Sequence, residues 1–458
     1  MKIQETKEKK LEKIGQPENY SASNRVGKFR MLKWAAILLP ILLLAQGCSF
    51  FGGGGNTQGP EVTLVIWKLF DNQQALAPVF TSYRQLRNNV QFQFVEKDIA
   101  TYENDLLNAL ATGAGPDIFT IHNDWLPRYQ DKMSPAPEEL FTDREIEETF
   151  VDVVRTDLYG SEGELYALPL STDVLALYYN RDLLGSAGIA QPPSTWDEIL
   201  DAVKKLTQQD RLGNFLVHGI ALGTADNINR STDILSLLML QNGTQVYNQG
   251  RTQATLATDI VAPDGTRYNP GEQALEFYTQ FSNPAKPTYT WNNRSNYSVD
   301  SFAAGQTAMM ISYWYMGDIL RDKAPLLNFG VAPVPQIDVS KPKINYANYF
   351  AEGVSRMSPN SAWAWDFLKF ASSAESLNTY YGRHLQPASR KDLISQQIVR
   401  SDLGIFAEGA LTARSYHKPD SARVERIFAD MINDVVVRGK SPENAVSDAN
   451  RLLNELLR

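Results

Sequence analysis

The fold class follows from residues 61–121, where three β-rich runs alternate with two helical patterns. The runs are EVTLVIW at 61–67, VQFQFV at 90–95 and DIFTI at 117–121. The spacing of apolar residues predicts helices over 74–87 and 101–111. Strands that alternate with helices form a parallel, doubly wound sheet, so we predict an α/β fold that binds its ligand beyond the carboxyl ends of the strands.

Further along the chain, the sequence predicts a strand at 175–179 and a series of helices. Thr195 and Glu198 form a capping box at the start of a helix that runs to about residue 207. The other predicted helices cover 234–240, 271–281 and 362–370. A chain of 458 residues is too long for one ordinary core, so we expect two lobes with a cleft between them.

The first 60 residues differ from the rest of the chain. Lys28, Arg30 and Lys33 precede an apolar run over 34–45, which ends in small residues before Cys48, the only cysteine. Twelve helical residues cover about 18 Å, which is short of a hydrocarbon core of roughly 30 Å. We therefore predict a signal peptide over 1–47 with a lipobox-like end and lipidation of Cys48. The alternative is an uncleaved anchor that leaves Cys48 as a free thiol.

Residues 48–60 are rich in glycine, so we expect a flexible tether from the lipid anchor to the folded domain. This arrangement places the protein on the cell membrane, facing the extracytoplasmic side. With no second cysteine, the exported domain has no internal disulfide.

Charge excludes one class of partner. The chain holds 44 Lys/Arg and 52 Asp/Glu. Nine of the basic and four of the acidic residues lie in residues 1–47, so residues 48–458 hold 35 basic and 48 acidic residues, a net charge of −13. Binding to phosphate backbones requires a basic surface, so we do not expect nucleic acid as a partner.

Five further motifs stand out along the chain: GAGPDI at 113–118, LYYNRDLL at 177–184, PPSTWDE at 192–198, FAAGQTAM at 302–309 and NFGVAPVP at 328–335. In kind and in order they resemble motifs of family 1 extracellular solute-binding proteins, the class that contains maltose-binding protein. Together they span most of the chain after the tether, so the sequence resembles that family along nearly its whole exported length.

The resemblance implies a two-lobed periplasmic-binding-protein fold of type II, with doubly wound sheets joined by a hinge of several chain crossings. It implies crossings near 171–172, 331–335 and 372. The first lobe would then comprise 61–171 plus 333–371, and the second 172–332 plus 372–458. It also implies a monomer that captures a carbohydrate, expected to be an oligosaccharide, and hands it to the permease subunits of an ABC importer.

A sugar offers hydroxyl groups and apolar C–H faces, so its site needs carboxylates, amides and aromatic rings. Asp173 matches a ligand-binding position of the family, with a hinge residue bonded to backbone as the alternative. Trp314 ends a family strand that carries a stacking aromatic, and a core position is its alternative. Asn123 and Asp124 follow the GAGPDI strand, and one of them could instead cap a helix. Asp71 is either a ligand contact or a helix cap.

Four further residues lie on loops that face the cleft in relatives. They are Tyr102, Arg230, Tyr349 and Glu352.

Other function classes are weaker. The acidic pairs lie in charged helical runs, and no Gly-x-Ser-x-Gly or His-Glu-x-x-His motif occurs, so we expect no enzyme activity. The four histidines are isolated in sequence, so we expect no metal site and no cofactor. The same fold could carry a polyamine, a glycerol phosphate or iron instead of sugar, or it could report a solute as a sensor.

Overall fold

The computed structural model describes residues 60–262 and 264–458, which belong to one compact unit. The first lobe is built on a six-stranded sheet in the order β2-β1-β3-β15-β4, with β5 also paired to β15. Its strands are β1 (Val62–Leu69), β2 (Val90–Lys97), β3 (Ile118–His122), β4 (Met133–Ser134), β5 (Ala167–Leu168) and β15 (Phe350–Ser355). β1 runs parallel to β2 and β3, which confirms the predicted β-α-β-α-β arrangement, whereas β15 runs antiparallel to β3.

Helices accompany this sheet, and they include the three predicted over 74–87, 101–111 and 362–370. They are α2 (Gln73–Leu86), α3 (Ile99–Thr112), α4 (Leu126–Tyr129), η1 (Gln130–Lys132), α5 (Asp143–Thr149), α6 (Val153–Asp157), α13 (Ser361–Ala371) and α14 (Ala374–Tyr381). Gly113 ends α3 with a φ of 71°, a left-handed conformation that favours glycine. A Cβ atom on Gly115 would lie 2.9 Å from Leu110, so this glycine lets the loop pack against α3. The GAGPDI motif is therefore explained by backbone geometry.

The second lobe contains a sheet of β7 (Ala176–Asn180) between β12 (Met309–Ser312) and β13 (Phe329–Pro333), all paired antiparallel. Around it lie α7 (Arg181–Ser186), α8 (Trp196–Leu206), α9 (Ser231–Gln241), α10 (Pro270–Thr279), η2 (Gln280–Ser282), α11 (Ser298–Ala303), α12 (Met316–Lys323), α15 (Lys391–Gln397) and α16 (Ser401–Ala410). Two short hairpins, β8 (Gln208–Gln209) with β9 (Phe215–Val217) and β10 (Ile260–Val261) with β11 (Arg267–Tyr268), extend from it. The predicted capping box at Thr195 and Glu198 is present at the start of α8.

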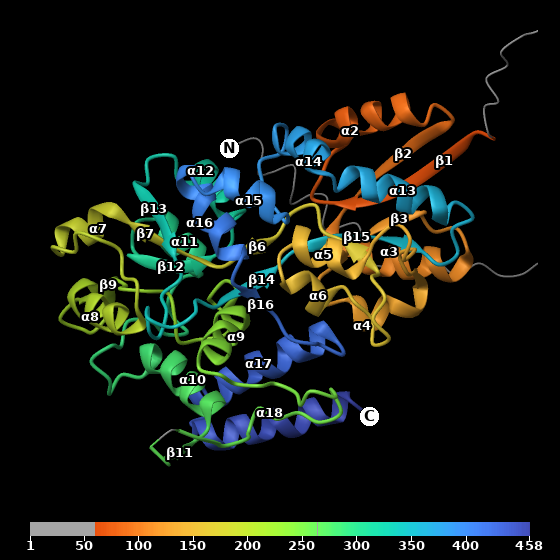
Figure 1. The fold of residues 1–458 in the computed structure, drawn as a ribbon. Helices are drawn as coiled ribbons and strands as arrows, with labels where there is room; N and C mark the ends of the chain where they lie inside the picture. The colour runs from red at the N-terminus through yellow and green to blue at the C-terminus, as the bar shows by residue number, and fades with distance from the viewer. Residues whose placement is uncertain (1–59, 263) are drawn as a thin grey trace, which may run out of the picture. The chain divides into compact units, whose positions relative to one another are not determined.

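The last two helices, α17 (Ser421–Val436) and α18 (Pro442–Leu456), pack against each other and against α9 and α10 (Figure 1). Figure 1 also shows β1, β2, β3 and β15 grouped apart from β7, β12 and β13. Each lobe thus encloses its own sheet, as the two-lobed prediction requires.

Short extended segments join the lobes. β6 (Asp173–Val174) pairs with β14 (Asn345–Asn348), which pairs with β16 (Ala413–Arg414). Beside them, Ser171 bridges Ala388, and the backbone N–H of Thr172 donates to the carbonyl of Pro387 at 3.1 Å. α14 packs on α2 of the first lobe, which favours a third crossing nearer 387 than 372. The lobe boundaries themselves stay a prediction.

The predictions for the N-terminal segment concern residues that the structure does not describe. The signal peptide over 1–47, the lipidated Cys48 and all of the 48–60 tether except Pro60 lie outside the described residues. Among the residues that are described, none of the helices has the length and apolar character needed to cross a bilayer.

Candidate functional site

The edge of the first lobe where β1 and β3 end and β15 begins, which the sequence predicts to face the ligand, carries a cluster of aromatic rings. We call Phe70, His122, Trp125 and Phe350 the aromatic edge. Phe350 lies at the centre, with its ring centroid 5.1 Å from Phe70, 5.0 Å from His122 and 6.4 Å from Trp125. Phe70 is 58% exposed and has a φ of 59°, a strained conformation for a residue other than glycine. These rings offer an apolar surface to a ligand.

A pocket of about 450 Å³ lies beside this edge at Trp125. It lies between the first turns of α3 and α17, and Glu103, Arg128 and Glu425 also line it. The pocket thus combines one aromatic ring with charged and polar groups from both lobes, a mixture that suits a ligand with hydroxyl groups and apolar faces.

Asp71 lies next to the aromatic edge and is buried in a network of charges. Its carboxylate accepts hydrogen bonds from the Tyr380 hydroxyl at 2.9 Å and from Nδ1 of His384 at 2.6 Å, and it lies 3.1 Å from Nζ of Lys68. Burial alone would raise the pKa of Asp71, but the charge of Lys68 and the contacts with His384 and Tyr380 together outweigh burial and hold the pKa at about 2. Asp71 is not the cap of α2, because that cap is Asn72, which accepts from the N–H of Ala75. The cap alternative for Asp71 is therefore wrong.

Glu352 lies within β15, so its predicted loop position is wrong, and it belongs to the same network. Its carboxylate pairs with Lys68 and accepts a hydrogen bond from the Thr120 hydroxyl at 2.9 Å. The charges of Glu352 and Asp71 raise the pKa of Lys68, although burial alone would lower it. In the described arrangement Glu352 is therefore engaged inside the lobe.

Asp173 and Trp314 are in direct contact, through backbone hydrogen bonds to the Asp173 carboxylate of the kind that its hinge alternative describes. Both carboxylate oxygens of Asp173 lie 3.0 Å from the backbone N of Trp314, and the backbone N–H of Val174 donates to Asp173 at 2.8 Å. Burial nevertheless raises the pKa of Asp173 to about 7. The Trp314 ring is half-buried and packs 5.4 Å from Phe406, while its Nε1 donates to the carbonyl of Leu385 at 3.1 Å.

His384 and Leu385, which are adjacent in the chain, connect Asp71 with the pair of Asp173 and Trp314. His384 contacts Asp71, and Leu385 contacts Trp314, which in turn is held by Asp173. The structure therefore brings together Asp71 from the first lobe with Asp173 and Trp314 from the second.

Arg230 precedes α9 with a φ of 59°. Its guanidinium lies over the rings of Tyr313 and Tyr315, and Nε donates to the Tyr315 hydroxyl at 3.2 Å. The charge of Arg230 also acts on Asp173, so it belongs to the same side of the site.

Asn123, Asp124 and Tyr349 are engaged in contacts within the protein. Nδ2 of Asn123 donates to Asp157 at 2.9 Å, and the Tyr349 hydroxyl donates to the same carboxylate at 3.0 Å. Asp124 lies 2.8 Å from Nζ of Lys418 and 2.5 Å from Nδ1 of His122. Neither Asn123 nor Asp124 caps α4, whose first turn receives no side-chain cap, so that alternative is wrong.

Tyr102 occupies a core position. Its side chain is fully buried, its hydroxyl donates to the backbone carbonyl of Thr120 at 2.6 Å, and its ring stacks 6.3 Å from Trp125. It therefore supports Trp125 of the aromatic edge from within the lobe. For all nine residues, direct contact with a ligand stays a prediction.

Sequence reasoning missed Phe350, Trp125 and His384. Phe350 and Trp125 each stand beside a residue that was singled out, Tyr349 and Asp124, and the aromatic type itself was the available signal. His384 gave no such signal, because its partner Asp71 lies 313 positions away in the chain.

A family model described as "Bacterial extracellular solute-binding protein" matches residues 69–377. The chain belongs to that family. The matched region covers the aromatic edge, Asp71, Asp173 and Trp314. The family is one of binding proteins, in agreement with a site built from aromatic rings and hydrogen-bonding groups.

Individual relatives of this solute-binding protein are distant. A maltotriose-binding protein of Pyrococcus abyssi is 21% identical over 398 residues, which cover 84% of this chain and 79% of that protein. A binding protein of Brucella abortus is 25% identical over 254 residues, or 54% of this chain, and the chain spans only 55% of its length.

A solved structure of a cyclo/maltodextrin-binding protein complexed with maltotetraose superposes with a TM-score of 0.70. The two are 19% identical, and the match covers 87% of this chain and 98% of that chain. At this identity the similarity establishes the fold, which is the two-lobed α/β fold predicted from the sequence.

Proposed function

We propose that this protein captures an oligosaccharide outside the cytoplasmic membrane and delivers it to an ABC importer, without converting it chemically. The observation that carries the proposal is the aromatic edge, which lies next to the hydrogen-bonded groups around Asp71, Asp173 and Trp314. Apolar C–H faces of a sugar pack on aromatic rings, while its hydroxyls need carboxylate, amide or imidazole partners. The maltotriose-binding relative and the maltotetraose complex support the same class of ligand.

The number of rings in the aromatic edge favours a ligand with more than one sugar ring. The ring centroids of Phe70, His122 and Trp125 lie 5.1, 5.0 and 6.4 Å from that of Phe350. A cluster of several rings can pack against more than one apolar sugar face. Trp314 would supply a further apolar face from the second lobe, positioned by the bond from its backbone N–H to Asp173.

Thermal unfolding tests the ligand class directly. A ligand at one hundred times its Kd stabilises a protein by about 2.7 kcal/mol, so the full chain should show a clear rise in Tm with maltotriose or another oligosaccharide from a panel. Trp314→Ala should remove that rise, because it deletes the half-buried ring of the site. Trp363→Ala is the matched control: this partly buried tryptophan lies in α13 and should leave the ligand response intact.

The same panel should include a polyamine, a glycerol phosphate and iron. A response to one of these and to no sugar would contradict the proposal while leaving the fold unchanged. Loss of the sugar response in both tryptophan variants would show that it depends on general stability and not on the proposed site.

We also propose that the protein acts as a monomer tethered to the membrane through a lipid on Cys48. The support is the sequence before it, a short apolar run followed by small residues. Cells grown with a labelled fatty acid should label the natural chain but not Cys48→Ala, and the variant should leave the membrane fraction. A labelled Cys48→Ala protein would contradict the anchor.

A further inference from the structure

Two pairs of side chains join the lobes away from the aromatic edge. Nζ of Lys418 lies 2.8 Å from Asp124, and the Ser415 hydroxyl donates to the carboxylate of Asp157. The Asp124 and Lys418 side chains are only 5% and 10% exposed. We call Asp124, Asp157, Ser415 and Lys418 the interlobe clasp.

The members of the clasp come from different lobes. Asp124 follows β3 and Asp157 ends α6, both in the first lobe. Ser415 and Lys418 lie between β16 and α17, and α17 packs against α9 and α18 of the second lobe. Any movement that separates the lobes at this place must therefore break both contacts.

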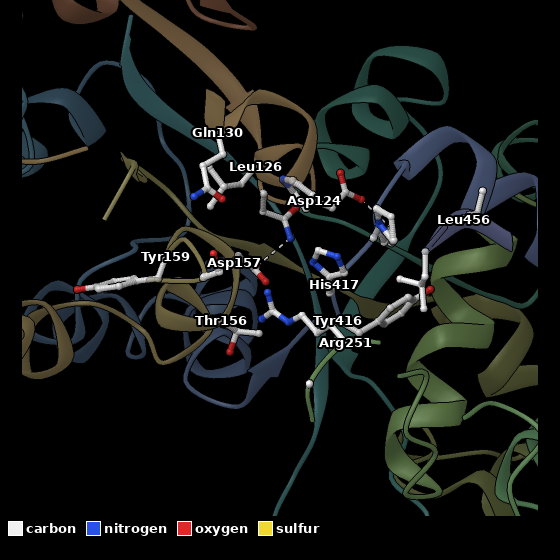
Figure 2. A pocket seen from close by; sticks show the side chains of 17 residues that line it. Asp124, Leu126, Gln130, Thr156, Asp157, Tyr159, Arg251, Tyr416, His417 and Leu456 are labelled. Carbon is white, nitrogen blue, oxygen red and sulfur yellow. Dashed lines mark hydrogen bonds and ion pairs between the residues drawn. The ribbon is translucent and has the colours of Figure 1, made fainter. Parts of the chain in front are cut away.

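A pocket of about 450 Å³ adjoins the clasp, and residues of both lobes line it (Figure 2). Figure 2 shows the Arg251 guanidinium pointing toward Asp157, with His417 between Asp124 and Tyr416. Tyr159 of the first lobe also lines this pocket. Separation of the lobes here would widen the pocket and expose Asp157 to water.

We propose that the interlobe clasp holds the two lobes in the described arrangement and strengthens at mildly acidic pH. Its four residues act as positioning residues for ligand binding. The link to ligand binding rests on the proposed function, because it assumes that the ligand binds between the same two lobes. The clasp itself is independent of the ligand's identity.

The pH dependence follows from the surroundings of Asp157. Burial raises its pKa to about 6, hydrogen bonds from Ser415, Asn123 and Tyr349 lower it, and the charge of Asp124 raises it further. Once the lobes separate and water reaches the carboxylate, its pKa should fall toward the ordinary value of about 3.9. The clasped state therefore binds the proton more tightly, so acidification favours it, by about tenfold between pH 7.5 and pH 5.

The other groups that face Asp157 do not account for this change. Burial and the charge of Arg251 lower the pKa of His417 to about 4, so this imidazole stays neutral over the range. Burial raises the pKa of Asp124, but the charges of His122 and Lys418 outweigh it and hold that pKa well below the ordinary value. Burial alone would lower the pKa of Lys418, but the charges of Asp124 and the neighbouring tyrosines raise it, so Lys418 stays protonated. Arg155, on α6 itself, carries its charge throughout.

Electron spin-label distances in the full chain test the clasp without any ligand. Labels at Glu162→Cys and Gln249→Cys, two exposed positions adjacent to pocket residues of the first and second lobes, would be placed in a Cys48→Ser background. We expect the ratio of short to long distances to rise about tenfold from pH 7.5 to pH 5. Asp157→Asn should make that ratio independent of pH.

Ser415→Ala provides a second variant that leaves the buried carboxylate in place. It should shift the distances toward the longer population at both pH values, because it removes the hydroxyl that the second lobe contributes. A pH-independent distance in the natural sequence, or the same pH response in Asp157→Asn, would overturn the clasp.

Ligand titration then tests the positioning role. With the sugar found in the thermal panel, Kd should fall severalfold more from pH 7.5 to pH 5 in the natural sequence than in Asp157→Asn, because both proteins share any titration of Asp173 in the site. A pH-dependent distance combined with the same pH dependence of Kd in both proteins would overturn the positioning role. If no sugar binds while the distances respond as expected, the proposed function fails and the clasp stands.

Discussion

Asp71 and Asp157 are both buried aspartates of the first lobe, yet their pKa values move in opposite directions. The pKa of Asp71 falls to about 2, whereas that of Asp157 rises to about 6. Burial opposes ionisation at both positions. The difference arises because Asp71 pairs with Lys68 at 3.1 Å, whereas among the described residues no ion pair forms at Asp157, whose hydrogen bonds do not offset its burial and the negative charge of Asp124. A cation in direct contact, and not the degree of burial, decides whether a buried carboxylate stabilises the protein as an anion.

Removing the positive charge of Lys68 should produce the largest change in the free energy of unfolding. Lys68→Met leaves both Asp71 and Glu352 buried without their charge partner, so we expect a loss of about 4 kcal/mol in the free energy of unfolding. Urea unfolding at pH 7.5 measures it. Lys204→Met, which breaks an exposed pair with Asp201, should cost less than about 0.5 kcal/mol. A cost for Lys68→Met as small as that of the control would show that the Lys68 network is not stabilising.

Neutralising each aspartate in turn should give changes of opposite sign. The folded-state pKa of Asp71 is depressed, so its stabilisation is present above pH 4 and is lost as the pH falls toward 2. Asp71→Asn should therefore cost about 2 kcal/mol at pH 7.5. The folded-state pKa of Asp157 is raised, so its favourable contribution is present below pH 4 and is lost as the pH rises through 6.

Asp157→Asn removes the cost of a buried anion and should be neutral or stabilising at pH 7.5. Urea unfolding of both variants at pH 7.5 and pH 5 checks the pair. Equal destabilisation by the two substitutions at pH 7.5 would refute the comparison.

The smallest expected effect concerns the hydroxyl that donates to Asp71. Tyr380→Phe removes this hydrogen bond to a charged acceptor and should cost about 1.5 kcal/mol. Tyr297→Phe, at a half-exposed tyrosine on the surface of the second lobe, should change stability by less than about 0.5 kcal/mol. Thermal unfolding of the two variants side by side is sufficient, and an unchanged Tm for Tyr380→Phe would remove Tyr380 from the network.

Prediction from sequence succeeded where the signal was local. The three strands of 61–121, the helices between them and the capping box at Thr195 depend on side chains within a few positions of each other. Prediction from sequence was less informative about the roles of single residues. Asp71 and Asn72 are adjacent and both are common caps, and only the coordinates assign the cap to Asn72. Tyr102 was expected on a loop that faces the cleft, whereas it lies within α3 and its side chain turns inward to Thr120.

The sequence by itself determined the α/β class, the two lobes and the family, because hydrophobic periodicity, caps and short motifs are encoded locally and recur in order. The tertiary structure alone decided which polar groups act together. His384 reaches Asp71, Leu385 reaches Trp314 and Ser415 reaches Asp157 across separations of 313, 71 and 258 positions. The energies of such contacts depend on burial and on the charge of the partner, and neither exists until the chain has folded.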